Sequence, residues 1–528
     1  MLAFRKKDEN RRKKQQGDSD MERNEEFLHT AESLKPKLYT KYEPAKATVR
    51  FHKDDNGKIM QQPTANYRET RLKKGDVLCL DFGAHLVGKV KLSFGYEGSH
   101  PDAPVWLKLK FAERPCELFE NVEDYNGWIC MGWIQHEQIH VDILPACLEL
   151  PRRYAFRYLE ITVLDVSRKF QLILNDAVCE SSTSADDSKL TKYENSSARM
   201  VQLDAVACRT LRSCMQDVFE DGPKRDRRLW LGDFRMQALV NYETYQNFDL
   251  VKRCLYLFAG STKDKGRIGA CLFTEPEVEV DDTEMFDYSL FFIPTLLDYY
   301  KATGDMDTLR ELAPSCWRQV ELVQAFFDKK DLTNFAQGPG CFVDWNLELN
   351  KQASAQGIYL YCVRAAIEVA QILDDSKKVV WLISDYERKK KAAALLWDEE
   401  KRCYISGSDR QISWASQIWM ILGGALDVLE GGKLLNRLEH MNGVEKMVTP
   451  YMYHNYVDAL LTVGQNDKAL NILCEYWGGM LDQGADTFWE LYNPENPNES
   501  PYGGTIVNSY CHAWSCAPAY FLRKYFRQ

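Results

Sequence analysis

The spacing of apolar residues changes once along the chain, near residue 185, and this change constrains the fold more than any other feature. Between about residues 47 and 180, short apolar runs alternate with turn residues, as at 77–81, 88–94, 106–111 and 158–164. Such runs predict β-strands, and several strands at this spacing indicate a sandwich or jelly roll. The sequence therefore predicts an antiparallel, jelly-roll-like β-sandwich over residues 40–182.

Beyond residue 185 the apolar residues follow a helical period. Two such stripes are Met200, Leu203, Val206, Leu211 and Met215, and Ile358, Val363, Ile367, Ala370 and Leu373. Counting stripes of this kind predicts about twelve helices, and segments 453–462 and 468–477 are joined by a very short turn, as in an αα-hairpin. A solenoid of repeats is the competing fold, but no repeat of fixed period is visible in the sequence. Because short loops make antiparallel neighbours, we expect an all-α (α/α)₆ toroid over residues 185–528.

Composition narrows the classes of partner. The chain of 528 residues carries 67 basic and 77 acidic residues, a net charge of −10, so we expect no nucleic-acid partner. Residues 1–35 carry dense mixed charge, which predicts a poorly ordered, solvated arm. The longest apolar runs are well short of the ~20 residues that a membrane span needs. The 16 cysteines are scattered singly and no apolar leader is visible, which predicts a reduced, cytoplasmic protein.

One apparent metal motif is rejected on its periodicity. Residues 136–140 read His-Glu-Gln-Ile-His, the H-E-x-x-H pattern of zinc proteases, which requires a helix. Apolar Ile139, Val141 and Ile143 alternate with polar residues here, which predicts a strand. On a strand the two histidines would lie ~13 Å apart, too far to bind one zinc ion. We therefore predict no metal site, and no cofactor.

Three separated loops each place a tryptophan beside carboxylates. Residues 220–233 contain Glu220, Asp221, Arg225, Asp226, Trp230 and Asp233; residues 482–490 contain Asp482, Asp486, Trp489 and Glu490, with His512 further on; and the third loop contains Asp344 and Trp345. A solvated charged loop or a helix N-terminus would explain any one of them. A helical toroid, however, gathers its inter-helix loops at one end. There, acids can bind sugar hydroxyls while a tryptophan stacks on a ring face, which predicts a sugar site.

Carboxylate pairs of this kind are what glycoside hydrolysis requires. One carboxyl group, kept protonated, donates its proton to the leaving oxygen. The other, ionised, activates a water molecule or attacks the anomeric carbon directly.

The loops resemble those of the α-L-rhamnosidases of glycoside hydrolase family 78. Residues 221–233 are similar to that family's D-C-P-x-x-E…W-x-G-D loop, and residues 484–490, Gly-Ala-Asp-Thr-Phe-Trp-Glu, to its G-A-T-T-x-W-E segment. Residues 508–512 are similar to its N-H-Y/A element, and residues 343–345 to its G-D-W. In the β part, residues 80–88 and 156–160 are similar to L-D-F-G-Q-N-x-x-G and F-R-Y-V-E. The resemblance covers the chain from about residue 75 to its end.

This resemblance implies a β-sandwich followed by an (α/α)₆ catalytic domain. It also implies an inverting, exo-acting hydrolase that releases terminal α-L-rhamnose from small rhamnosides. By position, Asp226 corresponds to the general acid and Glu490 to the general base. The positions implied to bind sugar are Asp221, Arg225, Trp230, Asp233, Asp344, Trp345 and His512, and we add Trp489 from its place beside Glu490.

The sequence departs from the family's motifs at two positions, so we keep alternative functions beside the main prediction. Asp226 stands where the family usually has glutamate, and Gly222 where it commonly has cysteine. One methylene less moves the acid by about 1.5 Å, and proton transfer is sensitive to such a displacement. The alternatives are a hydrolase of the same fold that acts on another α-glycoside or a uronide, and a non-catalytic sugar-binding relative. The aglycone and the oligomeric state, a homodimer included, stay open.

Overall fold

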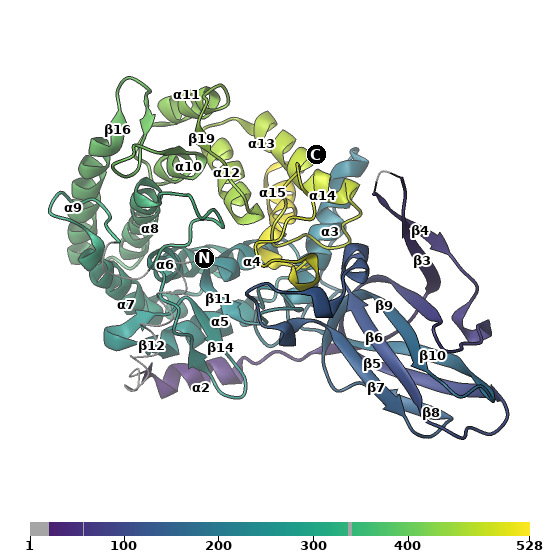
Figure 1. The fold of residues 1–528 in the computed structure, drawn as a ribbon. Coiled ribbons are helices and arrows are strands. Elements are labelled where there is room, and N and C mark those ends of the chain that lie inside the picture. The colour runs from purple at the N-terminus through teal and green to yellow at the C-terminus, as the bar shows by residue number, and fades with distance from the viewer. Residues whose placement is uncertain (1–20, 56, 336–339, 528) are drawn as a thin grey trace.

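The computed structural model describes residues 21–55, 57–335 and 340–527. An antiparallel sheet comes first along the chain, and a helical region follows beside it (Figure 1). Within the described residues this sheet has nine strands, and their pairings are antiparallel. They are β2 (Tyr39–Pro44), β3 (Ala47–Lys53), β4 (Ile59–Pro63), β5 (Val77–Gly98), β6 (Val105–Ala112), β7 (His136–Val141), β8 (Ala146–Glu149), β9 (Tyr154–Asp165) and β10 (Phe170–Thr183).

Strand β5 organises the sheet, because it pairs with β3, β8, β9 and β10. The sequence predicts two strands at 77–81 and 88–94, whereas the structure has one continuous strand of 22 residues. The pairing with β9 shifts register between Asp81 and Leu86, around Gly83, whose φ is +83°. Beyond the shift, Val90, Leu92 and Phe94 alternate into the apolar core of the sheet.

Residues 136–140 lie in strand β7, as predicted. Strand β7 pairs with β6, where His136 faces Lys110 and His140 faces Trp106. The two histidines are therefore spread along a strand and do not meet as they would on a helix. In the part of the chain that the structure describes, no group of three or more His, Cys, Asp and Glu side chains is placed to hold a metal ion.

Thirteen α-helices follow in the described part of the chain, from α3 to α15. Helix α3 begins after Ser197, whose hydroxyl accepts from the Met200 amide, and buries the predicted residues Leu203, Val206 and Leu211. The helices are α3 (Ala198–Cys214), α4 (Leu231–Glu243), α5 (Phe248–Gly260), α6 (Phe286–Thr303), α7 (Met306–Leu322), α8 (Gln352–Ile372), α9 (Ser376–Ala393), α10 (Trp414–Leu422), α11 (Val428–Leu438), α12 (Pro450–Thr462), α13 (Asn466–Ile472), α14 (Gly478–Asp482) and α15 (Ala517–Tyr525).

Every second helix along the chain packs against the next but one. Helix α4 packs on α6, α6 on α8, α8 on α10, and α10 on α12. The last helix, α15, returns to pack on α3 and α4 (Figure 1). This return brings the long loop before α15 beside the loop before α4, where the Ala513 amide donates to the Asp221 carbonyl at 3.0 Å.

The predicted αα-hairpin is present, but its second helix is interrupted. Helices α12 and α13 pack together across a short turn, and α13 ends at Ile472. A π-helical turn, Leu473–Trp477, then leads into α14. The buried Trp477 indole donates to the Ser515 carbonyl at 2.8 Å, which ties this turn to the loop before α15.

The predicted disordered arm needs a correction. Residues 1–20 lie outside the described part, but Glu25–Ser33 forms helix α2. The Asn24 side chain caps this helix by accepting from the Glu26 and Phe27 amides. Leu28 and Ala31 are buried as α2 packs on α5, so two apolar residues among many charges order the segment. Among the described residues, no helix has the length and apolar character to cross a membrane.

Candidate active site

The loop between α3 and α4 is closed by backbone pairing. The Asp221 amide donates to the Arg228 carbonyl, and the Arg228 amide donates to the Asp221 carboxylate, each at 3.0 Å. A Cβ on Gly222 would lie 2.6 Å from the Arg225 carbonyl and 2.7 Å from the Ser509 hydroxyl. The glycine thus allows a tight turn, and this turn directs Arg225 toward the neighbouring loop.

The loop between α14 and α15 folds back on itself. The Glu490 amide donates to the Ser509 carbonyl at 3.0 Å, and the His512 amide donates to the Phe488 carbonyl at 2.9 Å. Glu490 and His512, which are 22 residues apart in sequence, therefore lie on adjoining segments.

Arg225 joins the two predicted catalytic carboxylates. Its Nη1 lies 3.3 Å from Asp226 Oδ1, and its Nη2 donates to Glu490 Oε2. The Tyr502 hydroxyl donates to the other Glu490 oxygen, and the Tyr502 ring lies 4.2 Å from the guanidinium. The Asp226 side chain is 22% exposed and that of Glu490 is 7% exposed. Asp226 is thus the carboxylate open to solvent, and Glu490 is the one held inside.

The surroundings of Glu490 act on its pKa in opposite directions. Burial raises the pKa of Glu490, and the nearby Asp226 adds to the rise. The Arg225 charge and the hydrogen bonds from Tyr502 and Arg225 lower it. The net effect is a raised pKa. Because a cation and a hydroxyl donor both favour the ionised form, Arg225 and Tyr502 are the groups that oppose this rise.

Asp221, Asp233 and His512 form a second buried group. His512 Nε2 lies 3.8 Å from Asp221 Oδ2, and His512 Nδ1 lies 3.6 Å from Asp233 Oδ1, both too long for hydrogen bonds. The Tyr288 hydroxyl donates to Asp233 Oδ2 at 3.3 Å. Asp233 Oδ1 and His512 Nδ1 have no hydrogen-bond partner among the described residues. Since buried polar atoms almost always find a partner, these two atoms are placed to bind a ligand or water.

Burial shifts the pKa values of the second group toward the neutral forms. Burial raises the pKa of Asp221 and of Asp233 well above the ordinary value, and the neighbouring carboxylates add to both shifts. Burial, together with the Arg225 charge, lowers the pKa of His512 well below its ordinary value. Acids and an imidazole whose neutral forms are favoured in this way can donate and accept hydrogen bonds, which suits an uncharged hydroxylated ligand.

Two of the three predicted tryptophans border these groups. Trp230 lies half-buried, edge-on to Tyr288, with ring centroids 6.1 Å apart. Trp345 lies half-buried, edge-on to Tyr502, at 6.0 Å. The Trp345 Nε1 is buried and has no partner among the described residues. Trp345 thus adds a third unpartnered polar atom to the site.

Trp489 needs a correction. Its side chain is 1% exposed, and the Arg114 guanidinium lies 4.1 Å from its ring centroid. Tyr492 and Tyr510 pack edge-on against the same ring. The structure therefore gives Trp489 a packing role in place of its predicted sugar contact, because its ring face is already covered.

Asp344 is satisfied inside the protein. Its Oδ1 accepts from the amides of Trp345 at 2.9 Å and Thr449 at 3.1 Å and from the Thr449 hydroxyl at 2.6 Å, while Oδ2 accepts from the Val448 amide at 2.8 Å. Burial raises the pKa of Asp344 to about 6. Thr449 is the N-cap of α12, so Asp344 fixes the start of that helix. The sugar contact of Asp344 stays a prediction.

Sequence reasoning missed Tyr502 and Tyr288. Tyr502 follows Glu490 by 12 residues in a Pro-Tyr-Gly-Gly segment typical of a turn, and Tyr288 lies within helix α6. Neither stands next to an acid–tryptophan pair in the sequence. Only the folded chain brings their hydroxyls to Glu490 and Asp233.

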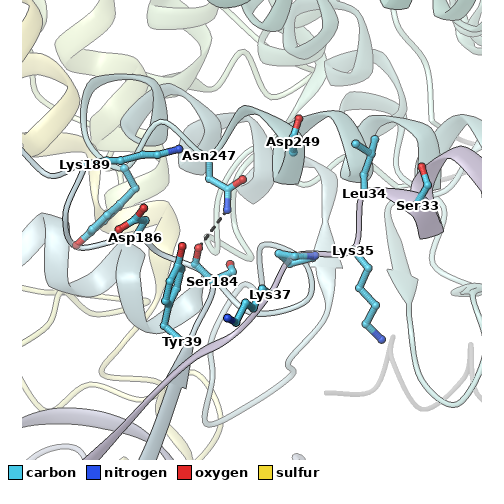
Figure 2. A pocket seen from close by; sticks show the side chains of 12 residues that line it. Ser33, Leu34, Lys35, Lys37, Tyr39, Ser184, Asp186, Lys189, Asn247 and Asp249 are labelled. Carbon is cyan, nitrogen blue, oxygen red and sulfur yellow. Dashed lines mark hydrogen bonds between the residues drawn. The ribbon is translucent and has the colours of Figure 1, made fainter.

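Two hollows differ in their relation to these carboxylates. One of about 270 Å³ lies near the start of α5, where residues 33–37, 184–189 and 245–249 line it (Figure 2). A smaller hollow is lined by Glu490 and Tyr502, together with Leu491, Pro501, Asn508, Ser509 and Tyr510. Its volume is only about 10 Å³, so it is too small for a sugar ring. We place the site at the paired carboxylates and the unpartnered buried atoms described above.

Two family models match the chain. Residues 46–181 match the glycosyl hydrolase family 78 alpha-rhamnosidase N-terminal domain. Residues 189–526 match the bacterial alpha-L-rhamnosidase 6 hairpin glycosidase domain. No curated protein sequence matches the chain.

Solved structures agree with these matches. A rhamnosidase from Klebsiella oxytoca with rhamnose bound is 43% identical, with 96% of this chain and 99% of that chain covered and a TM-score of 0.93. A family 78 rhamnosidase from Bacillus sp. GL1 is 21% identical; the match covers 88% of this chain and 49% of that chain, with a TM-score of 0.73. The Streptomyces avermitilis α-L-rhamnosidase complexed with L-rhamnose is 17% identical; the match covers 93% of this chain and 44% of that chain, with a TM-score of 0.64. The latter two show the fold alone. By its family models and its likeness to the Klebsiella enzyme, the chain belongs to the α-L-rhamnosidases of glycoside hydrolase family 78.

Proposed function

We propose that the protein is an inverting exo-hydrolase that releases terminal α-L-rhamnose from small rhamnosides, with Asp226 as general acid and Glu490 as general base. One observation carries this proposal: Arg225 contacts both carboxylates, one open to solvent and one buried. The likeness to the Klebsiella oxytoca rhamnosidase, solved with rhamnose bound, supports the choice of sugar.

The two carboxylates suit different steps of the reaction. Glu490, whose ionised form is favoured by Arg225 and Tyr502, takes a proton from the attacking water. Asp226 donates a proton to the leaving oxygen. Both carboxylates contact the Arg225 guanidinium, each through a different nitrogen. An inverting pair needs a separation of ~6.5–9.5 Å between its carboxyl groups, which leaves room for that water.

The second buried group would hold the sugar. The unpartnered atoms of Asp233, His512 and Trp345 supply both donors and acceptors for ring hydroxyls. A uronide would bring a negative charge toward buried Asp221 and Asp233. Since burial and the neighbouring carboxylates already disfavour a negative charge in this group, it supports a neutral sugar over the uronide alternative.

Two further proposals concern the whole chain. We propose that α4, α6, α8, α10, α12 and α15 form the inner ring of a closed (α/α)₆ toroid, which the successive packing of these helices and the return of α15 to α4 support. We also propose a cytoplasmic location. All 16 cysteines lie in the described part of the chain and are free thiols, which supports a reducing compartment.

A panel of nitrophenyl glycosides tests the proposed substrate. We expect 4-nitrophenyl α-L-rhamnoside to be hydrolysed with a higher kcat/KM than other nitrophenyl α-glycosides and a nitrophenyl uronide. Preferred turnover of another member would contradict the sugar assignment and favour the same fold with a different substrate. Binding of L-rhamnose in calorimetry, with no turnover of any glycoside, would favour the non-catalytic relative.

A further inference from the structure

A loop of the sheet domain reaches the segment that carries Tyr502. This loop, residues 113–135, connects β6 to β7. It shares a small apolar cluster with residues 502–507: Ile134, Tyr502, Ile506 and Val507 form it, and Val122, Tyr125 and Ile129 pack against it. The cluster draws on these two segments alone, which are more than 360 residues apart in the sequence.

Polar contacts reinforce this cluster. Glu120 Oε1 accepts from the Thr505 amide at 3.0 Å and from the Thr505 hydroxyl, and Glu120 Oε2 accepts from the Ile506 amide at 3.1 Å. One carboxylate therefore holds two successive backbone amides of the catalytic domain. The Trp128 indole donates to the Pro501 carbonyl at 2.9 Å, at the other end of the same segment.

The backbone of Tyr502 itself is held from the sheet domain. The Tyr125 hydroxyl donates to the Tyr502 carbonyl at 2.9 Å and accepts from the Ile129 amide at 3.2 Å. Gly127 lies against the same carbonyl, with no space for a Cβ. The Trp128 ring also packs on the Tyr502 ring, with centroids 5.3 Å apart.

Tyr502 connects these contacts to the predicted base. Its side chain is buried, its hydroxyl donates to Glu490, and its ring covers Arg225. We propose that Glu120 and Tyr125 of the sheet domain are positioning residues that fix Tyr502 against Glu490. This inference rests on the proposed role of Glu490 in the reaction.

The direction of the effect follows from the groups that face Glu490. These are Arg225 and Asp226 from the loop before α4, Asp233 from α4 and Tyr502 from its own loop. Arg225 and the Tyr502 hydroxyl lower the pKa of Glu490, against the effect of burial and of Asp226. If Tyr502 moves away, the pKa of Glu490 rises. Because the base acts when ionised, the acid limb of the kcat/KM profile then moves to higher pH.

The test is the pH profile of kcat/KM on whichever nitrophenyl glycoside the wild-type protein hydrolyses best. We expect Tyr502→Phe to move the acid limb upward by about half a pH unit or more and to lower kcat. Tyr125→Phe and Glu120→Gln should move the limb in the same direction by less. Tyr193→Phe is the matched control, because it also removes a tyrosine hydroxyl that donates to a backbone carbonyl, that of Phe526 at 2.9 Å, and should leave the profile unchanged.

The outcomes separate this inference from the proposed function. An unmoved acid limb in both Tyr125→Phe and Glu120→Gln, with only a lower melting temperature, would show a purely structural contact and overturn the inference. If Glu120→Gln fails to fold, Tyr125→Phe, which removes a single oxygen atom, decides alone. Full activity in Glu490→Gln would overturn both the proposed base and the inference. An inactive Glu490→Gln, together with an unmoved acid limb in Tyr125→Phe and Glu120→Gln, would overturn the inference only.

Discussion

At the scale of single residues, the chemistry depends on two carboxyl groups that share one guanidinium. Arg225 contacts Asp226 on one nitrogen and Glu490 on another, while Tyr502 occupies the remaining Glu490 oxygen. The carboxyl groups of Asp226 and Glu490 therefore lie in different environments. A buried, cation-bound Glu490 suits proton acceptance, and a partly exposed Asp226 suits donation to a departing group.

Removal of either carboxyl group should abolish most of the turnover. We expect Glu490→Gln to lower kcat/KM on 4-nitrophenyl α-L-rhamnoside by about 10²–10⁴-fold, the range for loss of general acid–base catalysis. Asp226→Asn should lose less on this substrate than on an alkyl rhamnoside, because nitrophenolate leaves without much help from an acid.

The control for this pair is Asp482→Asn. Asp482 is an exposed carboxylate that pairs with Arg199 on the surface, so its loss should leave kcat/KM unchanged. Activity close to that of the wild type in Glu490→Gln on the nitrophenyl rhamnoside, or in Asp226→Asn on an alkyl rhamnoside, would refute the assigned roles.

The sequence could predict much of this site, and its errors have a physical cause. The pattern of acid beside tryptophan, with the family resemblance, predicts Asp226 and Glu490 as a pair from loops more than 260 residues apart, and the structure brings both into contact with Arg225. The same pattern misplaced Trp489, because adjacency in the sequence does not decide which way a side chain faces: its ring is covered by Arg114, Tyr492 and Tyr510.

At the scale of elements, the turn at Gly222 positions the catalytic loop. A Cβ there would meet the Arg225 carbonyl at 2.6 Å, so an added methyl group must displace the backbone that carries Arg225. We expect Gly222→Ala to lower kcat about 10-fold or more, because small displacements of catalytic groups cost much in rate. The fall in melting temperature should be small by comparison.

Gly340→Ala is the matched control for that variant. A Cβ at Gly340 meets nothing within 4 Å, so this substitution should change neither kcat nor stability. Wild-type kcat in Gly222→Ala would mean that the loop relaxes without moving Arg225, and would contradict the positioning role of the turn.

Element boundaries show where sequence patterns lose information. The sequence predicts two strands within β5, because its apolar runs at 77–81 and 88–94 are separate, whereas the strand continues through a register shift between Asp81 and Leu86. Helix α2 was missed, because only Leu28 and Ala31 are buried and α5 supplies the surface that orders them. In both cases, tertiary contacts decided the local structure.

At the scale of the whole molecule, the sheet domain supports the catalytic loops through buried polar contacts. His85 of β5 lies 3.1 Å from the Ser213 hydroxyl of α3 and 2.9 Å from Glu113. The other Glu113 oxygen accepts from the Tyr510 amide at 2.7 Å, in the same loop as His512. None of these contacts could be derived from sequence patterns, because each joins distant segments through a side chain with no local signature.

The His85 contacts predict a pH-dependent stability. Burial lowers the pKa of His85, but the Cys511 thiol and the hydrogen bond and charge of Glu113 raise it, with a net value of about 9. Since this value lies above the ordinary 6.5, the protonated histidine stabilises the fold fully below pH 6.5, and the contribution is lost as the pH rises through about 9.

Thermal unfolding of His85→Gln checks this window. We expect the variant to melt below the wild type by a larger margin below pH 6.5 than above pH 9. His29→Gln, at an exposed position of α2, is the matched control and should melt like the wild type at both pH values. An equal margin for His85→Gln at both pH values would mean that the histidine is neutral in the folded protein.

The most direct test of the proposed chemistry is the stereochemistry of the first product. The ¹H NMR spectrum of 4-nitrophenyl α-L-rhamnoside, followed from the moment that enzyme is added, distinguishes the anomers of the released sugar before they interconvert. With Glu490 acting as a base on water, β-L-rhamnose should appear first and the α anomer should grow in later by mutarotation. Appearance of α-L-rhamnose first would mean retention through a covalent intermediate, and would contradict the assignment of Glu490 as a base.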